Sequence, residues 1–465
     1  MEKNELVKND TSEKPDLLDV YFFNNLVRNR FFKPAVNLVF FAVLMIILYY
    51  GLASKPDLRF QGGIPFATTM IWDLWHPILA FTIIFFGRLW CFACPIGAVG
   101  DWTQSVFSLK KKYPEKYRNL WIAVILFLLI FAAERHFFMF TRNPPNTALL
   151  LIFFTVLAVV MGAIFEKRSF CRYICPIGLM LGVFSMLSIV ELRCRSKKTC
   201  AEHDIKECMI GTEAGKGCPV GEFPQTMERN NYCIMCMECV KSCSKDNIRI
   251  SPRLPGADII RSRKTHMDEA YLVHGIIIIF LFVMGMERFE FRNIIINFVR
   301  STAPFDYIAN FTFFTSYYRN MWAIIIFSLI TLGAAGLMYI STKVFSGGNT
   351  KQKFIDLSYA FIPLALSVYL AENTFRLLKG LFLIAATIGK LFGTVWEFAV
   401  NFQTINLIQI LLLISGFIFT AWAGYLISKK LSKNENELRQ SMMAIGVTAI
   451  IYLIIGMKIL TLPII

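Results

Sequence analysis

The sequence contains one run of four cysteines whose spacing is typical of an iron–sulfur cluster. Cys233, Cys236, Cys239 and Cys243 follow the pattern C-x₂-C-x₂-C-x₃-C, which wraps a [4Fe–4S] cube in bacterial ferredoxins. Cysteines at intervals of three let one loop reach three corners of a cube, while the fourth cysteine usually ligates a different cluster. A structural zinc knuckle is the alternative, although zinc sites rarely use this overlapping triple.

A looser quartet lies just upstream and ends in a Cys-Pro pair, Cys218-Pro219. In two-cluster ferredoxins the fourth cysteine of each motif crosses to the other cluster. Two groups of four ligands follow from this exchange. The central set is Cys218, Cys233, Cys236 and Cys239. The N-terminal set is Cys194, Cys200, Cys208 and Cys243. The alternative is that one or two of these cysteines are inert buried thiols.

The remaining cysteines lie in an internal repeat. The first copy is Arg88-x₂-Cys91-x₂-Cys94-Pro-Ile-Gly97, and the second is Arg168-x₂-Cys171-x₃-Cys175-Pro-Ile-Gly178. The repeat set is Cys91, Cys94, Cys171 and Cys175. Four thiolates from two helical hairpins predict a cube or a binuclear cluster, with a redox thiol pair or a Cu(I) site as the alternative. Disulfides are not expected, because the membrane topology predicted below places all four cysteines at the reducing, cytoplasmic face.

Most of the chain is predicted to lie in a membrane. Of its 465 residues, 56% are hydrophobic, above the ~45–50% of ordinary globular domains. No cleavable signal peptide is visible, so we expect the first apolar run to be retained. The apolar runs predict an α-helical integral membrane protein with about nine transmembrane helices. Their predicted ranges are 35–53, 69–87, 119–138, 147–166, 271–287, 321–342, 357–375, 406–428 and 441–463.

Four regions follow from these spans. They are a cytoplasmic N-terminal segment (1–34), a four-helix membrane domain with the cysteine–proline repeats (35–190), an inserted cytoplasmic two-cluster ferredoxin-like domain (191–268), and a C-terminal membrane domain of about five helices (269–465). Residues 381–400 are apolar but carry Lys390 and Glu397, and are predicted to lie flat on the outer interface.

The distribution of basic residues predicts the orientation. With the N-terminus inside, the inner loops hold 36 of the 48 Lys and Arg residues, as the positive-inside rule requires. The net charge of +16 is therefore attributed to loops that face the cytoplasm and anionic lipid, and no nucleic acid partner is expected. The protein is predicted to be multi-pass in the cytoplasmic (inner) membrane, with its N-terminus and clusters on the cytoplasmic side.

Histidines and acids within the spans are weaker candidates. His76 and His136 suit a quinol head group or a haem, and His274 lies near the inner start of the fifth span; intramembrane histidines are functional candidates by default. Taken singly, each is more simply an interfacial histidine bonded to a neighbour. The acids predicted to lie at outer helix ends are proton acceptors or ordinary interfacial charges: Glu134, Glu287, Glu290 and Glu372.

At Arg88–Gly97, Arg168–Gly178 and Cys218–Cys243 the chain resembles membrane polyferredoxins of the NapH, NosR and CcoG type. The resemblance covers about residues 35–270 and implies [4Fe–4S] clusters and electron transfer, often linked to quinol oxidation. The first cysteine pair is one residue shorter than the family's Cys-x₃-Cys. The last five spans lack a counterpart in the short quinol-dehydrogenase members, so the resemblance says little about the C-terminal half.

We therefore expect a membrane iron–sulfur protein that relays single electrons between a quinol or cytoplasmic donor and a redox partner. Its expected cofactors are two [4Fe–4S] clusters and a third iron–sulfur cluster in the repeat set, whereas quinol or haem has no support beyond the histidines. Expected partners are a redox protein or subunit and membrane lipid, with quinone as an option. The alternatives are a metal (copper) reductase in oxidase assembly and a cluster-based redox sensor.

Overall fold

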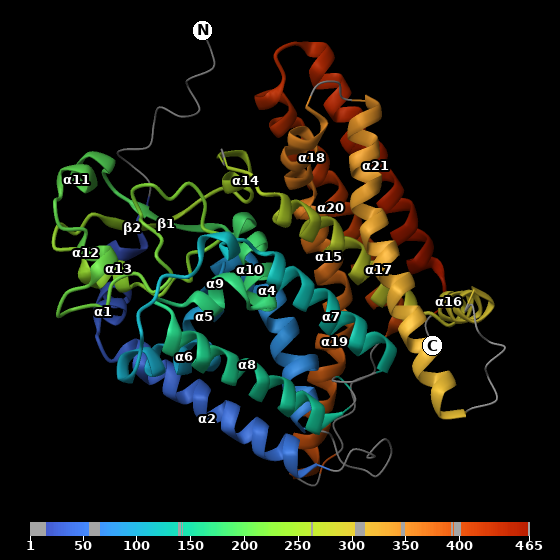
Figure 1. The fold of residues 1–465 in the computed structure, drawn as a ribbon, viewed down its shortest axis with the longest axis horizontal. Helices are drawn as coiled ribbons and strands as arrows, with labels where there is room; N and C mark the ends of the chain where they lie inside the picture. Colours follow the sequence, from blue (N-terminus) through green and yellow to red (C-terminus); the bar gives the residue numbers. More distant parts are fainter. Residues whose placement is uncertain are drawn as a thin grey trace. The chain divides into compact units, whose positions relative to one another are not determined.

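The structure is a computed structural model. It describes residues 15–54, 66–137, 141, 143–261, 264–302, 312–345, 349–391, 394 and 401–463 (Figure 1).

The predicted class of multi-pass α-helical membrane protein is confirmed. Within the described residues, eight helical segments are long and apolar enough to cross a bilayer. They are Phe32–Ala53, Phe66–Phe86, Pro144–Ile164, Met267–Met286, Ile325–Phe345, Thr350–Phe382, Phe402–Leu431 and Glu435–Thr461. The predicted span 119–138 forms helix α7 (Trp121–Phe137), whose apolar part, Trp121–Glu134, is shorter than the other eight.

The chain divides into two compact units. The cysteine unit comprises residues 1–44, 82–118 and 154–263, and the C-terminal unit comprises residues 45–81, 119–153 and 264–465. All twelve cysteines of the chain fall in the cysteine unit. This division follows packing, and the domain boundaries drawn from the sequence stay a prediction.

The cysteine unit is built from short elements around a two-stranded antiparallel sheet. Strand β1 (Val190–Cys194) pairs with β2 (Ile248–Pro252), so that Cys194 lies opposite Ile248. Its short helices are α1 (Tyr21–Arg28), α5 (Leu89–Ala93), α6 (Pro95–Val106), α9 (Ser169–Tyr173), α10 (Pro176–Phe184), α11 (Lys197–Glu202), α12 (Glu207–Ile210), α13 (Glu238–Ser242) and α14 (Ala257–Arg261), with 3-10 turns at Leu17–Asp19, Glu115–Tyr117 and Ser185–Leu187. Helices α2 (Phe32–Ala53), α4 (His76–Phe86) and α8 (Pro144–Ile164) each have one end in this unit.

The N-terminal residues pack onto the ferredoxin-like region of the same unit. Leu18 and Val27 share one buried apolar cluster with Leu192 and Ile250. Asp16 accepts a hydrogen bond from the Ile250 backbone N–H at 3.0 Å. The segment that precedes the first membrane helix is therefore part of the wall around the cysteines.

The C-terminal unit is a helical bundle in which α15 and α19 are the most buried helices. Helix α15 (Met267–Met286) and the segment Thr350–Phe382, which contains α18 (Thr350–Ser358) and most of α19 (Ile362–Leu391), are each 89% buried over their apolar windows. Helices α16 (Phe289–Thr302), α17 (Thr312–Phe345), α20 (Phe402–Leu431) and α21 (Glu435–Thr461) complete the bundle, together with α3 (Phe66–Thr68), a π-helix at Thr69–Trp75 and a 3-10 turn at Tyr359–Phe361 (Figure 1).

The predicted interfacial segment 381–400 does not start a new element. Residues 381–391 continue α19 as one helix, because no proline or glycine pair interrupts it before Leu391. Residues 392–400, apart from residue 394, lie outside the described residues.

Candidate metal centres

The central set surrounds one cavity. Its four cysteines line this cavity together with apolar side chains, among them Ile234 and Met237. Met235 and Met237 have left-handed backbones, with φ of 51° and 61°, a strained conformation that clusters at functional sites. These residues bend the loop around the cavity. Burial raises the pKa of Cys233 to about 12.

The N-terminal set lies around a second cavity. Cys200, Cys208 and Cys243 line this cavity, and Cys194 interacts electrostatically with Cys200. Asn247 donates from Nδ2 to Cys200 Sγ at 3.1 Å and from its backbone N–H to Cys243 Sγ at 3.4 Å. Hydrogen bonds to cysteine sulfur are one of the means by which proteins set the reduction potential of an iron–sulfur cluster.

The structure therefore brings Cys218 to the Cys233 loop and Cys243 to Cys200 and Cys208. This is the exchange of fourth cysteines that the spacing predicts. The binding of individual iron atoms by these sulfurs stays a prediction.

The repeat set is held by two copies of one local structure. In each copy a short helix, α5 or α9, is followed closely by a helix that begins with proline: Cys94 and Cys175 are the N-caps of these second helices, followed by Pro95 and Pro176. Proline suits this position because its fixed φ is helical and its missing N–H would be unpaired there anyway. Burial raises the pKa of Cys171 well above its usual value; Arg168 opposes this, and the other three thiols of the set add to it.

The two copies interlock through their arginines. Arg88 of the first copy donates to the Cys171 carbonyl of the second at 3.4 Å, and Arg168 of the second donates to the Cys91 carbonyl of the first at 2.7 Å. The glycine of each copy also lies against the arginine of the other copy. A Cβ atom at Gly97 would lie 3.0 Å from Arg168, and one at Gly178 would lie 3.1 Å from Arg88. Each copy therefore completes the other's cysteine turn.

The two arginines differ in their charged partners. Arg168 binds Asp101 with two hydrogen bonds, at 2.8 Å from Nε and 2.6 Å from Nη2, and Lys33 contacts the same carboxylate at 3.3 Å. Burial alone would raise the pKa of Asp101, but these two cations lower it to about 2. Among the described residues, Arg88 has no carboxylate within ion-pairing distance.

The three sets form a contiguous series in which the central set is in the middle. On one side, the Cys218 backbone N–H donates to the Cys208 carbonyl at 2.9 Å, which joins the central set to the N-terminal set. On the other side, Phe92 of α5 packs in one apolar cluster with Ile234 and Cys236. The loop before Cys233 is also bound directly, because Arg88 donates to the Asn231 carbonyl at 2.8 Å.

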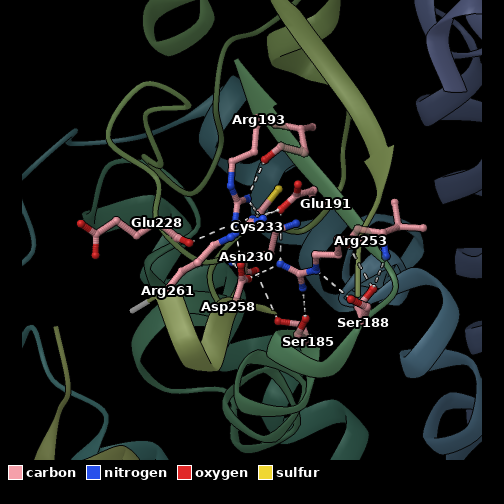
Figure 2. A network of polar contacts seen from close by, with 12 residues as sticks. Ser185, Ser188, Glu191, Arg193, Glu228, Asn230, Cys233, Arg253, Asp258 and Arg261 are labelled. Atoms are coloured by element: carbon pink, nitrogen blue, oxygen red, sulfur yellow. Dashed lines mark hydrogen bonds and ion pairs between the residues drawn. The ribbon is translucent and has the colours of Figure 1, made fainter. Parts of the chain in front are cut away.

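A buried ionic network holds the entry to the Cys233 loop (Figure 2). Its hub is the fully buried Asp258, which accepts hydrogen bonds from Arg193 at 2.7 Å and from the Asn230 backbone N–H at 2.6 Å and also pairs with Arg253. Arg253 in turn donates to the backbone carbonyls at the end of α10, including Ser185 at 2.7 Å. The network ties the loop of the central set to the helix that follows the repeat set.

The donor atoms fit iron–sulfur clusters. In the described part of the chain, no three His, Cys, Asp or Glu side chains converge on one single-ion site. The thiols of the central and N-terminal sets instead surround a volume, as the corners of a cube require. Four soft sulfur donors with N–H groups directed at them suit iron–sulfur ligation.

The intramembrane histidines are bonded to neighbours in the C-terminal unit. His76 contacts Asn373 at 3.0 Å and Tyr369 at 3.2 Å. His274 contacts Tyr452 and Ser358, both at 3.1 Å. These contacts match the simpler interpretation of each residue.

The other candidates outside the cysteine sets are local contacts where they are described. Glu372 pairs with Arg376 one turn further along α19. Glu134 accepts a hydrogen bond from the Thr141 backbone N–H at 3.0 Å. Glu287 ends α15, and Glu290 lies in the first turn of α16. The side chain of His136 lies outside the described residues.

Comparison with known proteins agrees with this chemistry. A family described as a 4Fe-4S binding domain matches residues 68–114 and 147–190, which contain the two cysteine–proline repeats. The chain is 28% identical to the uncharacterised protein MJ0749 of Methanocaldococcus jannaschii, over 47% of this chain and 85% of that one. No solved structure matches the chain.

Two further relatives match the chain over less than half of their own length. YccM of Escherichia coli, whose name refers to electron transport, is 28% identical over 32% of this chain and 46% of its own length. NirI of Paracoccus denitrificans is 25% identical over 46% of this chain and 35% of its own length. The chain thus spans less than half of either relative.

Together, the fold, the cysteine sets and these matches define a membrane polyferredoxin-like protein. The resemblance stated from the motifs is confirmed. The protein is a multi-pass membrane protein that carries a 4Fe-4S binding domain over its two cysteine–proline repeats.

Several residues of the site were not singled out from the sequence. Arg88 and Arg168 were visible as a shared Arg-x₂-Cys pattern, which could have identified them. Asp101, Asp258 and Asn247 carry no spacing signal, because their partners lie far away in the sequence.

Proposed function

We propose that the protein passes single electrons along three iron–sulfur centres held, in order, by the N-terminal, central and repeat sets. The observation that carries this proposal is the contiguity of the sets within one compact unit, with the central set in contact with both others. When bound, each cluster would supply a one-electron carrier. Three iron–sulfur centres in direct series would let an electron pass between a redox partner at one end and the membrane at the other.

The protein's own residues supply insulation and tuning. Ile234 and Val240 are 0% and 1% exposed, so they keep water away from the central set. Backbone N–H groups donate to sulfur in each set, as from Glu222 to Cys218 and from Gly178 to Cys175, both at 3.3 Å. Excluding water and directing dipoles at sulfur are the means by which a protein sets a cluster's potential.

We further propose that the clusters and the N-terminus face the cytoplasm at the cytoplasmic membrane. The support is the excess of Lys and Arg in the loops on that side. The relay would connect a quinol or cytoplasmic donor to a redox partner. The C-terminal unit lacks cysteine and would anchor the relay in the bilayer.

The first test is the metal content of the purified protein. Three cubes predict about 12 iron atoms per chain, with an equal amount of acid-labile sulfide. Low-temperature EPR after reduction should show more than one cluster signal. Zinc in place of iron, or iron well short of two cubes, would refute the proposal.

The second test separates the sets. Cys243→Ser should weaken the same EPR signal as Cys200→Ser, and Cys218→Ser should weaken the same signal as Cys236→Ser. If Cys243→Ser instead affects the Cys236 signal, each motif holds its own cluster and the proposed exchange is wrong. Cys171→Ser serves as the comparison for the repeat set, because it should leave both other signals in place.

A further inference from the structure

Arg88 is a buried cation with an incomplete set of partners. Arg88 is 2% exposed, and its guanidinium donates to the Asn231 and Cys171 backbone carbonyls. Its Nε atom is buried without a hydrogen-bond partner. A buried charge is costly unless an opposite charge compensates it, so a negative group must lie nearby.

The groups that interact electrostatically with Arg88 are the thiols of the repeat set and the carboxylate of Glu222, which does not form an ion pair with it among the described residues. Arg88 interacts electrostatically with Cys91, Cys171 and Cys175. The matching arginine of the second repeat differs, because Arg168 shares its charge with Asp101.

We propose that Arg88 is the counter-charge of the centre held by the repeat set and raises the reduction potential of that centre. This inference rests on the proposed function. Adding an electron makes a thiolate-bound cluster more negative, so a fixed positive charge beside it stabilises the reduced form more than the oxidised form. Net charge around a cluster is one of the terms that set its potential.

Arg88 also lies between the repeat set and the central set. One end of the guanidinium contacts the repeat set at Cys171, and the other contacts Asn231, two residues before Cys233 of the central set. The charge therefore lies on the side of the repeat set that faces the central set. Arg88 contacts a cysteine of the repeat set but only a neighbouring residue of the central set. Its positive charge would therefore stabilise an electron on the repeat set more than one on the central set.

The test is a redox titration of the full-length protein, monitored by EPR, on the signal that Cys171→Ser removes. Arg88→Gln should move that potential in the negative direction by at least a tenfold change in the reduction equilibrium, which is 59 mV for one electron. Arg88→Lys keeps the charge and should stay within that limit. D101N removes a negative charge beside the repeat set and should shift the potential in the positive direction.

The outcomes separate this inference from the proposed function. If Arg88→Gln retains iron and leaves the potential unchanged, Arg88 is only a structural residue and the inference is wrong. If Arg88→Gln loses the cluster, the reduction potentials of Arg88→Lys and D101N are measured instead. A shift of 59 mV or more in Arg88→Lys, or the lack of a positive shift in D101N, overturns the inference. If the wild-type protein has no signal that depends on Cys171, the proposed function itself fails at this set.

Discussion

The buried carboxylate Asp258 offers the sharpest test of how the cysteine unit is held together. Asp258→Asn keeps the size of the side chain but removes its charge. The change leaves the buried Arg253 and the partly buried Arg193 with Glu191 as the remaining acid, at 3.9 and 3.7 Å. Breaking a buried ion pair by removing one partner costs roughly 3–5 kcal/mol. We therefore expect a large loss of stability and poor retention of iron.

A matched control lies in the same unit. Asp246 pairs with Arg28, and the two side chains are 57% and 36% exposed. Exposed pairs contribute about 0–1 kcal/mol, so Asp246→Asn should change little.

The assay is thermal unfolding of both variants in one detergent, with iron content measured before heating. Because Asn230 binds Asp258, the EPR signal of the central set should suffer first in Asp258→Asn. The reasoning would be refuted if the two variants unfolded at the same temperature as the wild-type protein and kept the same iron.

Three further predictions concern single positions. Gly178→Ala should lose the cluster of the repeat set, because its Cβ would lie 2.9 Å from a backbone carbonyl, whereas Gly336→Ala in α17, with nothing within 4 Å, should keep its iron; equal iron in both variants would contradict this. Asn247→Leu removes the N–H that lies 3.1 Å from Cys200 and should make the potential of the N-terminal set more negative, which a redox titration measures; an unchanged potential would show that this bond does not tune it. Asp101 has its pKa lowered to about 2 by its two cationic partners, which outweigh the effect of burial. Its stabilising effect, about 2 kcal/mol, is thus present above about pH 4 and lost as the pH falls through about 2. The stability difference between iron-free wild-type protein and Asp101→Asn should narrow over that range, and a difference that stays constant would argue against the ion pair.

Cysteine spacing determined much of the site by itself. The C-x₂-C-x₂-C-x₃-C run and the Cys218-Pro219 pair were enough to predict two groups of four, because ligand spacing reflects the shape of the cluster that the cysteines must hold. The apolar runs likewise predicted the spans, since a helix must bury about 20 apolar residues to cross a bilayer. Length and charge alone did not predict the bounds of every helix. The apolar part of α7 is shorter than the predicted span, and α19 continues to Leu391 as one helix.

Only the tertiary structure decided what surrounds the cysteines. The exchange of Arg88 and Arg168 between the two repeats joins residues about 80 positions apart, and Asp258 reaches back 65 positions to Arg193. Such partners leave no periodic or spacing signal, because their positions depend on how the short elements pack. Sequence spacing thus predicted which sulfur atoms hold iron, and packing decided which charges and hydrogen bonds act on them.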